Sequence, residues 1–222
     1  MRLYALGLSA VLAITLIPSP ALAQGDFIKE NAGKIIRKIG FHVSTSFANP
    51  IDTKNVQKDG SYGLSVGLAP GTTNGWGYPF GFAWFTEELR TPDGPSFMKF
   101  QASPVVGGIG YGWHFGSKLS AGAQLQAGYS FNSGKPIGDV GAAFGMPGVP
   151  INVDIGDTFV YRPQLKVEYF LTKKFTVRSS LNYVFENPRV VISSPDGVLR
   201  NERWNASNVS LGMGIGIYPF RK

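Results

Sequence analysis

Apolar and polar side chains alternate along residues 105–131. Aromatic and aliphatic side chains occupy one set of alternate positions, whereas glycine, serine and glutamine occupy most of the other set, and the pattern is broken only at Gly116-Ser117-Lys118. Because side chains leave a strand on opposite faces in turn, a period of two predicts two strands joined by a tight turn. Both strands are longer than the roughly 5–6 residues common in soluble proteins. A tilted strand crosses a bilayer in about 9–11 residues, so the pattern predicts a hairpin that faces lipid outside and a small polar lumen inside.

Six further segments show the same alternation, which makes eight in total. The expected strands are residues 39–47, 61–68, 78–85, 105–115, 119–131, 159–171, 175–185 and 207–218. The connections are alternately long and short, and the long ones are residues 48–60, 86–104, 132–158 and 186–206. Short periplasmic turns and longer outer loops are typical of transmembrane barrels, and closure is required because open strand edges cannot be satisfied in hydrocarbon. We therefore expect an all-β, eight-stranded antiparallel up-and-down transmembrane barrel over residues 39–222. A soluble barrel or sandwich is the alternative, but it needs a second apolar face that these strands lack.

Residues 1–23 have the features of an export signal. Arg2 is followed by an apolar run over residues 5–17 and by Ala-Leu-Ala, which predicts cleavage after Ala23. The apolar run is shorter than the roughly 20 residues of a spanning helix. The chain has no cysteine, which excludes a disulfide framework and a cysteine-based metal site. Export together with lipid-compatible strands predicts the outer membrane of a Gram-negative bacterium.

The net charge of +7 does not indicate a nucleic-acid partner. The basic residues are scattered through turns, loops and the N-terminal segment, and export makes such a partner unsuitable. Attraction to anionic lipid head groups is the better physical use of this charge. Residues 24–38 form a basic amphipathic segment that is expected either to lie on the periplasmic lipid surface or to be a mobile leader.

The signal, the eight alternating strands and the hairpins ending in aromatic residues resemble the small outer-membrane barrels of the OmpA, OmpX and OmpW kind. The resemblance implies a monomer surrounded by outer-membrane lipid and lipopolysaccharide and inserted by the outer-membrane assembly machinery. One departure concerns the C-terminus, where such barrels often end in an aromatic residue. Here Phe220 is followed by Arg221 and Lys222, and Pro219 breaks the alternation.

The inward positions form a polar cluster in the predicted lumen. Its members are Arg162, Lys166, Glu168, Arg178, Gln124 and Gln126. If Leu171 pairs with Phe175, Glu168 lies directly opposite Arg178, as suits charges held in a low-dielectric interior. The cluster is interpreted either as a salt-bridged plug or as a charged constriction that selects solutes.

Glycines occupy many of the other inward positions. The lumen glycines are Gly108, Gly110, Gly112, Gly212, Gly214 and Gly216, with Gly63 and Gly67 on a third strand. The side chains of an eight-stranded barrel normally just fill its interior. The glycines therefore either leave a water-filled or ligand-sized cavity, or make room for long Arg, Lys and Gln side chains.

No pattern indicates catalysis. His42 and His114 are the only imidazoles, and no serine stands beside either in a recognisable motif. We expect no enzymatic activity, no cofactor and no metal. The loops offer Arg189, Arg200 and Arg203 for lipopolysaccharide phosphates, although simple solvated loops are the default.

The sequence thus predicts an outer-membrane barrel with a structural or surface-interaction role that presents loops at the cell exterior. The alternative is a narrow pore or transporter for small or hydrophobic solutes through the glycine-lined lumen.

Overall fold

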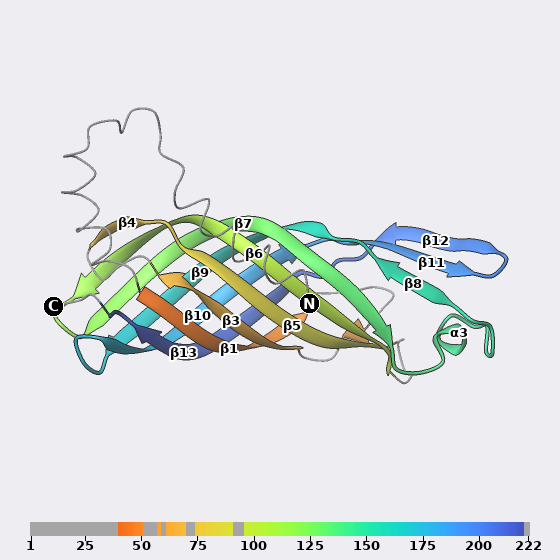
Figure 1. Ribbon diagram of the computed structural model, residues 1–222, viewed down its shortest axis with the longest axis horizontal. Helices are drawn as coiled ribbons and strands as arrows, with labels where there is room; N and C mark the ends of the chain where they lie inside the picture. The colour runs from red at the N-terminus through yellow and green to blue at the C-terminus, as the bar shows by residue number, and fades with distance from the viewer. Residues whose placement is uncertain (1–39, 51–56, 59–60, 70–73, 91–95, 220–222) are drawn as a thin grey trace, which may run out of the picture. The chain divides into compact units, whose positions relative to one another are not determined.

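Eight long strands close into a barrel (Figure 1). The computed structural model describes residues 40–50, 57–58, 61–69, 74–90 and 96–219. The barrel strands are β1 (Gly40–Pro50), β3 (Ser61–Ala69), β5 (Phe80–Arg90), β6 (Ser96–Phe115), β7 (Leu119–Pro136), β9 (Thr158–Phe170), β10 (Phe175–Glu186) and β13 (Asn208–Ile217). Each pairs antiparallel with the barrel strand before and after it, and β1 pairs with β13 from Phe41↔Ile217 to Pro50↔Asn208. This last pairing removes both sheet edges and confirms the predicted eight-stranded closure.

The exterior of the barrel is apolar and the interior is polar, as the alternation predicts. Leu125 is 57% exposed on β7, whereas its neighbours Gln124 and Gln126 are buried. The same contrast separates the exposed Leu165 on β9 from the buried Lys166. In water this arrangement would leave a large apolar surface uncovered, whereas hydrocarbon is a suitable solvent for it. The described residues contain no helix that is long and apolar enough to cross a bilayer.

Aromatic rings gather near both ends of the apolar exterior. At one end Trp76 packs edge-on against Tyr111, which lies beside Trp113. At the other end Tyr129 contacts both Phe131 and Phe159. Amphipathic rings at the two boundaries of an apolar band are typical of transmembrane barrels, where they lie at the head groups.

Tight turns connect the strands at one end, here named the turn end. The β6–β7 turn contains Gly116 at φ +71°, a left-handed conformation that glycine adopts without strain. In the β9–β10 turn the Leu171 N–H donates to the Phe175 carbonyl at 3.0 Å. This pairing places Glu168 directly opposite Arg178 across the two strands.

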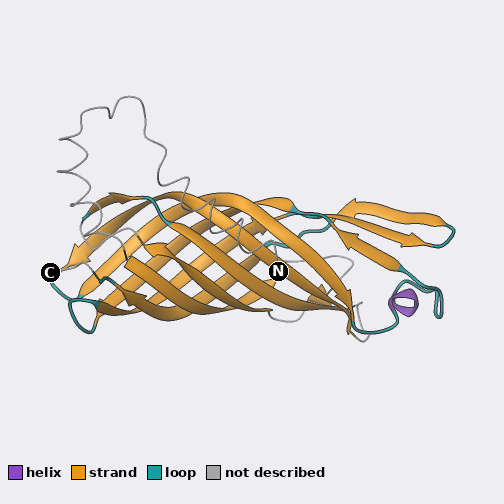
Figure 2. Ribbon diagram, viewed as in Figure 1, coloured by secondary structure: helices purple, strands orange, loops and turns teal. Residues whose placement is uncertain are grey.

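The opposite end, here named the loop end, is more structured than predicted. Much of the expected links 86–104, 132–158 and 186–206 is strand, because β5, β6 and β7 continue past the apolar band. Beyond them lie a three-stranded sheet and a one-turn helix (Figure 2). These elements are β8 (Asn152–Ile155), β11 (Arg189–Ser194), β12 (Gly197–Arg203) and α3 (Val140–Ala143). The expectation of simple solvated loops is wrong at this end, because these segments bury apolar side chains.

A hydrophobic core joins the loop-end elements to the barrel wall. It contains Phe97 and Phe100 from β6, Val190 and Ile192 from β11, and Ile155 from β8. Four of these five side chains are exposed by 4% or less, and Ile155 by 5%. We name β8, β11, β12, α3 and this core the head. Its burial replaces hydration of apolar groups by packing, which holds the head in a defined conformation.

Two short strands complete the fold, namely β2 (Gln57–Lys58), which pairs with β5, and β4 (Gly75–Gly77), which pairs with β6. The expected strand 78–85 begins two residues later, at Phe80, because Pro79 lacks the N–H that a strand ladder uses. The export signal 1–23, the leader 24–38 and the C-terminal residues 220–222 lie outside the described residues.

Candidate functional site in the barrel lumen

The lumen gathers the polar side chains from β7, β9, β10 and β13. All six members of the sequence-derived polar cluster are buried there, each less than 9% exposed. They reach the lumen because they alternate with lipid-facing residues along strands whose register is fixed by the pairing. Two layers can be distinguished along the lumen, one ionic and one made of amides.

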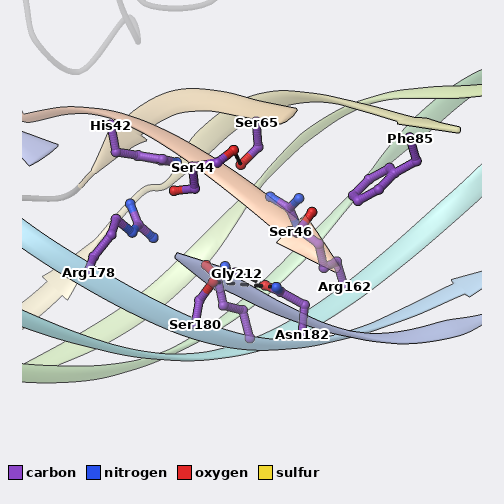
Figure 3. Close-up of a pocket in the computed structure, with 11 residues that line it drawn as sticks. His42, Ser44, Ser46, Ser65, Phe85, Arg162, Arg178, Ser180, Asn182 and Gly212 are labelled. Carbon is purple, nitrogen blue, oxygen red and sulfur yellow. Dashed lines mark hydrogen bonds between the residues drawn. The ribbon is translucent and has the colours of Figure 1, made fainter. Parts of the chain in front are cut away.

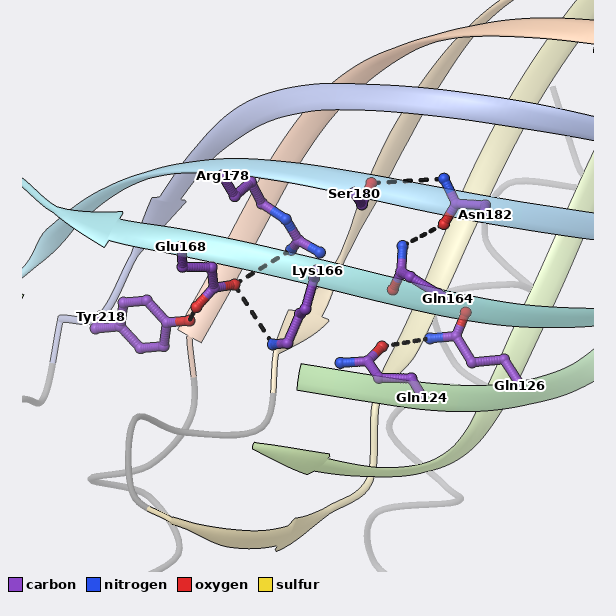
Figure 4. Close-up of polar contacts among 9 residues, drawn as sticks. All are labelled: Gln124, Gln126, Gln164, Lys166, Glu168, Arg178, Ser180, Asn182 and Tyr218. Carbon is purple, nitrogen blue, oxygen red and sulfur yellow. Dashed lines mark hydrogen bonds and ion pairs between the residues drawn. The ribbon is translucent and has the colours of Figure 1, made fainter. Parts of the chain in front are cut away.

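The ionic layer is centred on Glu168 (Figure 4). The Lys166 Nζ lies 3.4 Å from its carboxylate, and the Arg178 Nη1 lies 3.9 Å away. The Tyr218 hydroxyl donates to the second carboxylate oxygen at 2.8 Å. One buried carboxylate therefore faces two cations and one hydroxyl donor contributed by β9, β10 and the residue after β13. The arrangement ties together strands on both sides of β10.

The amide layer continues toward the loop end. The Gln126 side chain donates to Gln124 at 3.2 Å and accepts from the Arg162 Nε at 2.7 Å. Between the adjacent strands β9 and β10, Gln164 donates to the Asn182 side-chain oxygen. Hydrogen-bonded amides satisfy one another in a buried setting, where an unpaired polar group is costly. The layer thus fills the lumen with side chains that are fixed in place.

The lumen glycines make room for neighbouring groups. A Cβ on Gly110 would lie 2.6 Å from the Gln124 side chain, and one on Gly212 would lie 2.7 Å from the Ser180 hydroxyl. A Cβ on Gly108 would overlap the Leu125 backbone carbonyl, and one on Gly214 would overlap the Val43 carbonyl. Gly216 faces the Thr176 hydroxyl in the same way, and Gly112 pairs with Gly122 on β7. Of the two interpretations of the glycines, close packing of other groups is the one that these contacts support.

A small cavity remains between β1, β3, β9 and β10 (Figure 3). Its volume is about 20 Å³, which is the room that one water molecule needs. Arg162 and Arg178 line it together with serine hydroxyls from β1 and β10. A cavity of this size holds a water or a small ion and not an organic solute.

Apolar layers close the lumen on both sides of the polar layers. At the turn end, Phe170 packs on Tyr218 with ring centroids 5.6 Å apart, and His114 lies against Phe170. Toward the loop end, Val106, Val160 and Val184 form a buried cluster, and the core of the head follows. Among the described residues, these apolar layers thus lie on both sides of the polar layers and of the small cavity.

The two histidines lie in different parts of the lumen. His42 lines the small cavity, and His114 lies in the aromatic layer at the turn end. No group of three or more potential ligands among the described residues is arranged to hold a metal ion.

The three loop arginines named from the sequence contact different groups in the head. Arg200 lies over the Phe144 ring, 5.9 Å from its centroid. Arg189 donates to the Asn201 side chain, and Arg203 donates to the Asn187 carbonyl.

The sequence-derived polar cluster left out Gln164, Asn182 and Tyr218. Gln164 and Asn182 share the inward phase of the charged positions on their strands, so the alternation alone identifies them. Tyr218, the residue after β13, continues the inward phase of that strand, so the alternation identifies it as well. The head core was missed for a different reason, since Val190 and Ile192 find their partners on distant strands.

The architecture is shared with solved outer-membrane proteins. The crystal structure of OprG from Pseudomonas aeruginosa aligns with a TM-score of 0.63 at 12% identity, covering 81% of this chain and 95% of that chain. The solid-state NMR structure of AlkL in lipid bilayers gives a TM-score of 0.51 at 11% identity, covering 81% and 90%. The Escherichia coli protease OmpT aligns at 0.42 and 11% identity, covering 81% and 78%, a likeness too distant to bear on catalysis. No protein-family model and no curated protein matches the sequence. The closed eight-stranded wall, the apolar exterior and the likeness to OprG and AlkL together show that the chain has the fold of the small eight-stranded outer-membrane β-barrels.

Proposed function

We propose that this chain is a monomeric, non-enzymatic protein of the bacterial outer membrane that presents the folded head at the cell surface and does not conduct solutes. Its turn end faces the periplasm and its loop end faces outward, as is usual for such barrels. The observation that carries the proposal is the hydrophobic core that joins the head to the inside of the barrel wall. A head held in one conformation suits contact with a partner better than a set of solvated loops does.

The packing of the lumen supports the non-conducting part of the proposal. An ion that entered from the turn end would meet the Phe170–Tyr218 aromatic pair and then the Glu168 ion cluster. Opening a path would require breaking buried charge pairs, which is costly. The ionic cluster thus acts as a brace between strands rather than as a selectivity filter.

Single-channel recording tests this part. The full chain, folded in lipid and verified by heat-modifiable gel mobility, is inserted into a planar bilayer. We expect no discrete current steps. Reproducible steps would overturn the proposal and favour the narrow pore through the lumen, and a Glu168→Gln variant would then test whether the ionic cluster is its gate.

Cysteine labelling tests the orientation, because the chain contains no native cysteine. An Asp196→Cys variant places one thiol in the β11–β12 turn of the head, and a Ser117→Cys variant places one in the β6–β7 turn. On intact cells, a membrane-impermeant maleimide is expected to label the first and not the second. The reverse result would place the head in the periplasm and exclude a surface role.

β12, whose side chains are largely exposed on both faces of the strand, is the part of the head best suited to contact. Val198 is 65% exposed and Leu199 is 42% exposed, although both lie in an aqueous region in this orientation. Exposed apolar groups beside Arg200 fit an amphipathic partner such as lipopolysaccharide, whose phosphates and acyl chains offer both chemistries. Replacing both apolar residues by serine is expected to weaken binding of the folded chain to lipopolysaccharide vesicles while leaving its thermal unfolding unchanged. Equal binding by the variant would remove β12 from the proposal.

Insertion of the barrel is assigned to the outer-membrane assembly machinery.

A further inference from the structure

The small lumen cavity is lined by positive charge and by hydroxyl donors. Arg162 and Arg178 contribute guanidinium groups, and Ser44, Ser46 and Ser180 contribute hydroxyls, whereas no carboxylate lines the cavity. In Figure 3 the Arg178 guanidinium points toward β1, which carries the two serines Ser44 and Ser46. His42, Gln164 and Asn182 also line the cavity, and the charged side chains among the described lining residues are the two arginines.

Arg178 has donors that the described protein groups do not satisfy. Its side chain is 3% exposed, and neither Nε nor Nη1 has a hydrogen-bond partner within the described part of the chain. The Ser46 hydroxyl, on the opposite side of the cavity, is in the same state. Nearly all buried donors in folded proteins have a hydrogen-bond partner, so these unpaired donors indicate a partner other than the described protein groups.

Glu168 supplies only part of the counter-charge that Arg178 needs. Its nearest approach to Arg178 is 3.9 Å, beyond hydrogen-bond distance, and it also serves Lys166 and the Tyr218 hydroxyl. Arg162 is held through its Nε by the neutral amide of Gln126. Arg162, Lys166 and Arg178 thus share one nearby carboxylate, because the other two buried carboxylates among the described residues, Glu87 and Glu186, lie farther toward the loop end, opposite Phe100 and Val160. A buried charge without a counter-charge is strongly destabilising.

We propose that this cavity is a binding site for a small monovalent anion of the halide type. A volume of about 20 Å³ accepts one particle the size of a water molecule, which suits chloride or bromide and excludes sulfate, phosphate and carboxylic acids. A water would satisfy one or two donors but would leave the positive charge uncompensated. The anion is structural, and the site does not depend on the role proposed for the head.

Packed layers on both sides of the site determine how it fills. The aromatic layer lies toward the turn end, and the valine cluster lies toward the loop end. The anion therefore enters while the barrel closes, and the experiment has to control the anion present during folding. The full chain is refolded in lipid or detergent in sodium bromide or, at equal concentration, in sodium gluconate, whose anion is too large for the cavity.

Anomalous diffraction at the bromine edge is the direct test. Crystals of the bromide-refolded chain are expected to show one anomalous peak inside the barrel, between Arg178 and Ser46. An ordered particle at that place without anomalous signal would be water and would overturn the proposal. Bromide found only on the outer surface would overturn it equally.

Unfolding experiments provide a second, independent readout. Because a ligand of the folded state stabilises it by mass action, the urea midpoint of the chain is expected to rise with halide concentration and not with gluconate. Ser46→Ala removes one donor to the anion and is expected to weaken the apparent halide affinity about tenfold or more. Ser130→Ala, at a fully buried serine on β7 outside the cavity lining, is the control and should retain the wild-type halide dependence. A halide response that is absent in the wild-type chain, or equal in the Ser46 variant, contradicts the site.

Discussion

Glu168→Gln is the substitution that most directly tests the ionic layer of the lumen. The change keeps the shape of the side chain and removes its charge. It leaves Lys166 and Arg178 facing an amide, of which one half is itself a donor, and it weakens the bond from the Tyr218 hydroxyl. All three charged side chains are exposed by 7% or less, so solvent screens the loss only slightly.

The expected loss follows from the burial of the pair. Removing one partner of a buried ion pair costs about 3–5 kcal/mol, because the other charge is left without compensation. With a urea dependence of about 1–3 kcal/mol per molar, the unfolding midpoint should fall by about 1 M or more. The assay is equilibrium urea unfolding of the chain in lipid vesicles, followed by tryptophan fluorescence and by gel mobility.

The matched control is Glu88→Gln, an exposed carboxylate that lies opposite Lys99 on the neighbouring strand. Exposed pairs are worth less than about 1 kcal/mol, so this variant should unfold close to the wild-type midpoint. A double-mutant cycle of Glu168→Gln with Arg178→Met isolates the pair itself. A coupling energy below about 0.5 kcal/mol, or equal midpoints for the two glutamine variants, would refute the view that this layer braces the barrel.

Three further predictions address the exterior, the glycines and the head. Leu125→Arg, on the lipid-facing side of β7, should cost about 2–4 kcal/mol in vesicle unfolding, whereas Leu199→Arg in the head should cost almost nothing, and equal effects would contradict the membrane topology. Gly108→Ala should destabilise the barrel by about 1–3 kcal/mol through overlap with a backbone carbonyl, whereas Gly107→Ala, whose Cβ would lie 3.6 Å from an aromatic ring, should unfold like the wild type. Hydrogen bonds from backbone N–H groups hold the pKa of Asp139 below its usual value. The turn capped by this carboxylate should therefore persist above about pH 4 and be lost as the pH falls through the lowered pKa. Amide NMR of the turn can follow this transition, and Asp139→Asn should abolish the pH dependence.

The alternation of the chain was sufficient to predict the barrel. Side chains such as Leu125, Leu165 and Ile215 recur at every second position of long segments, and this period fixes both the strand state and the lipid-facing side. It also fixes the register at the turn end, because the three-residue turn after Leu171 leaves Glu168 only one partner position on β10. The same inference fails at Pro79, where a missing N–H delays the strand without changing the hydrophobic pattern.

The alternation of apolar and polar residues could not predict the head. Phe97, Phe100, Val190 and Ile192 belong to segments whose local pattern reads as loop, and their burial comes from contact between strands far apart in the sequence. Neither β6 nor β11 alone determines that contact. A period of two therefore predicts which side of a strand a residue occupies but not what covers that side beyond the membrane.

The lumen shows the same division. From the sequence alone, Arg162, Lys166, Glu168 and Arg178 were expected to face inward, and eight strands limit the space available to them. Whether the glycines open a passage or seat other side chains depends on distances across the barrel. Closure of β13 on β1 sets Gly214 against the Val43 carbonyl, and the closed wall leaves about 20 Å³ beside Arg178, which no local pattern encodes. Periodicity in the sequence determined the wall, and only the tertiary structure decided what fills it, because packing is a property of groups brought together by closure.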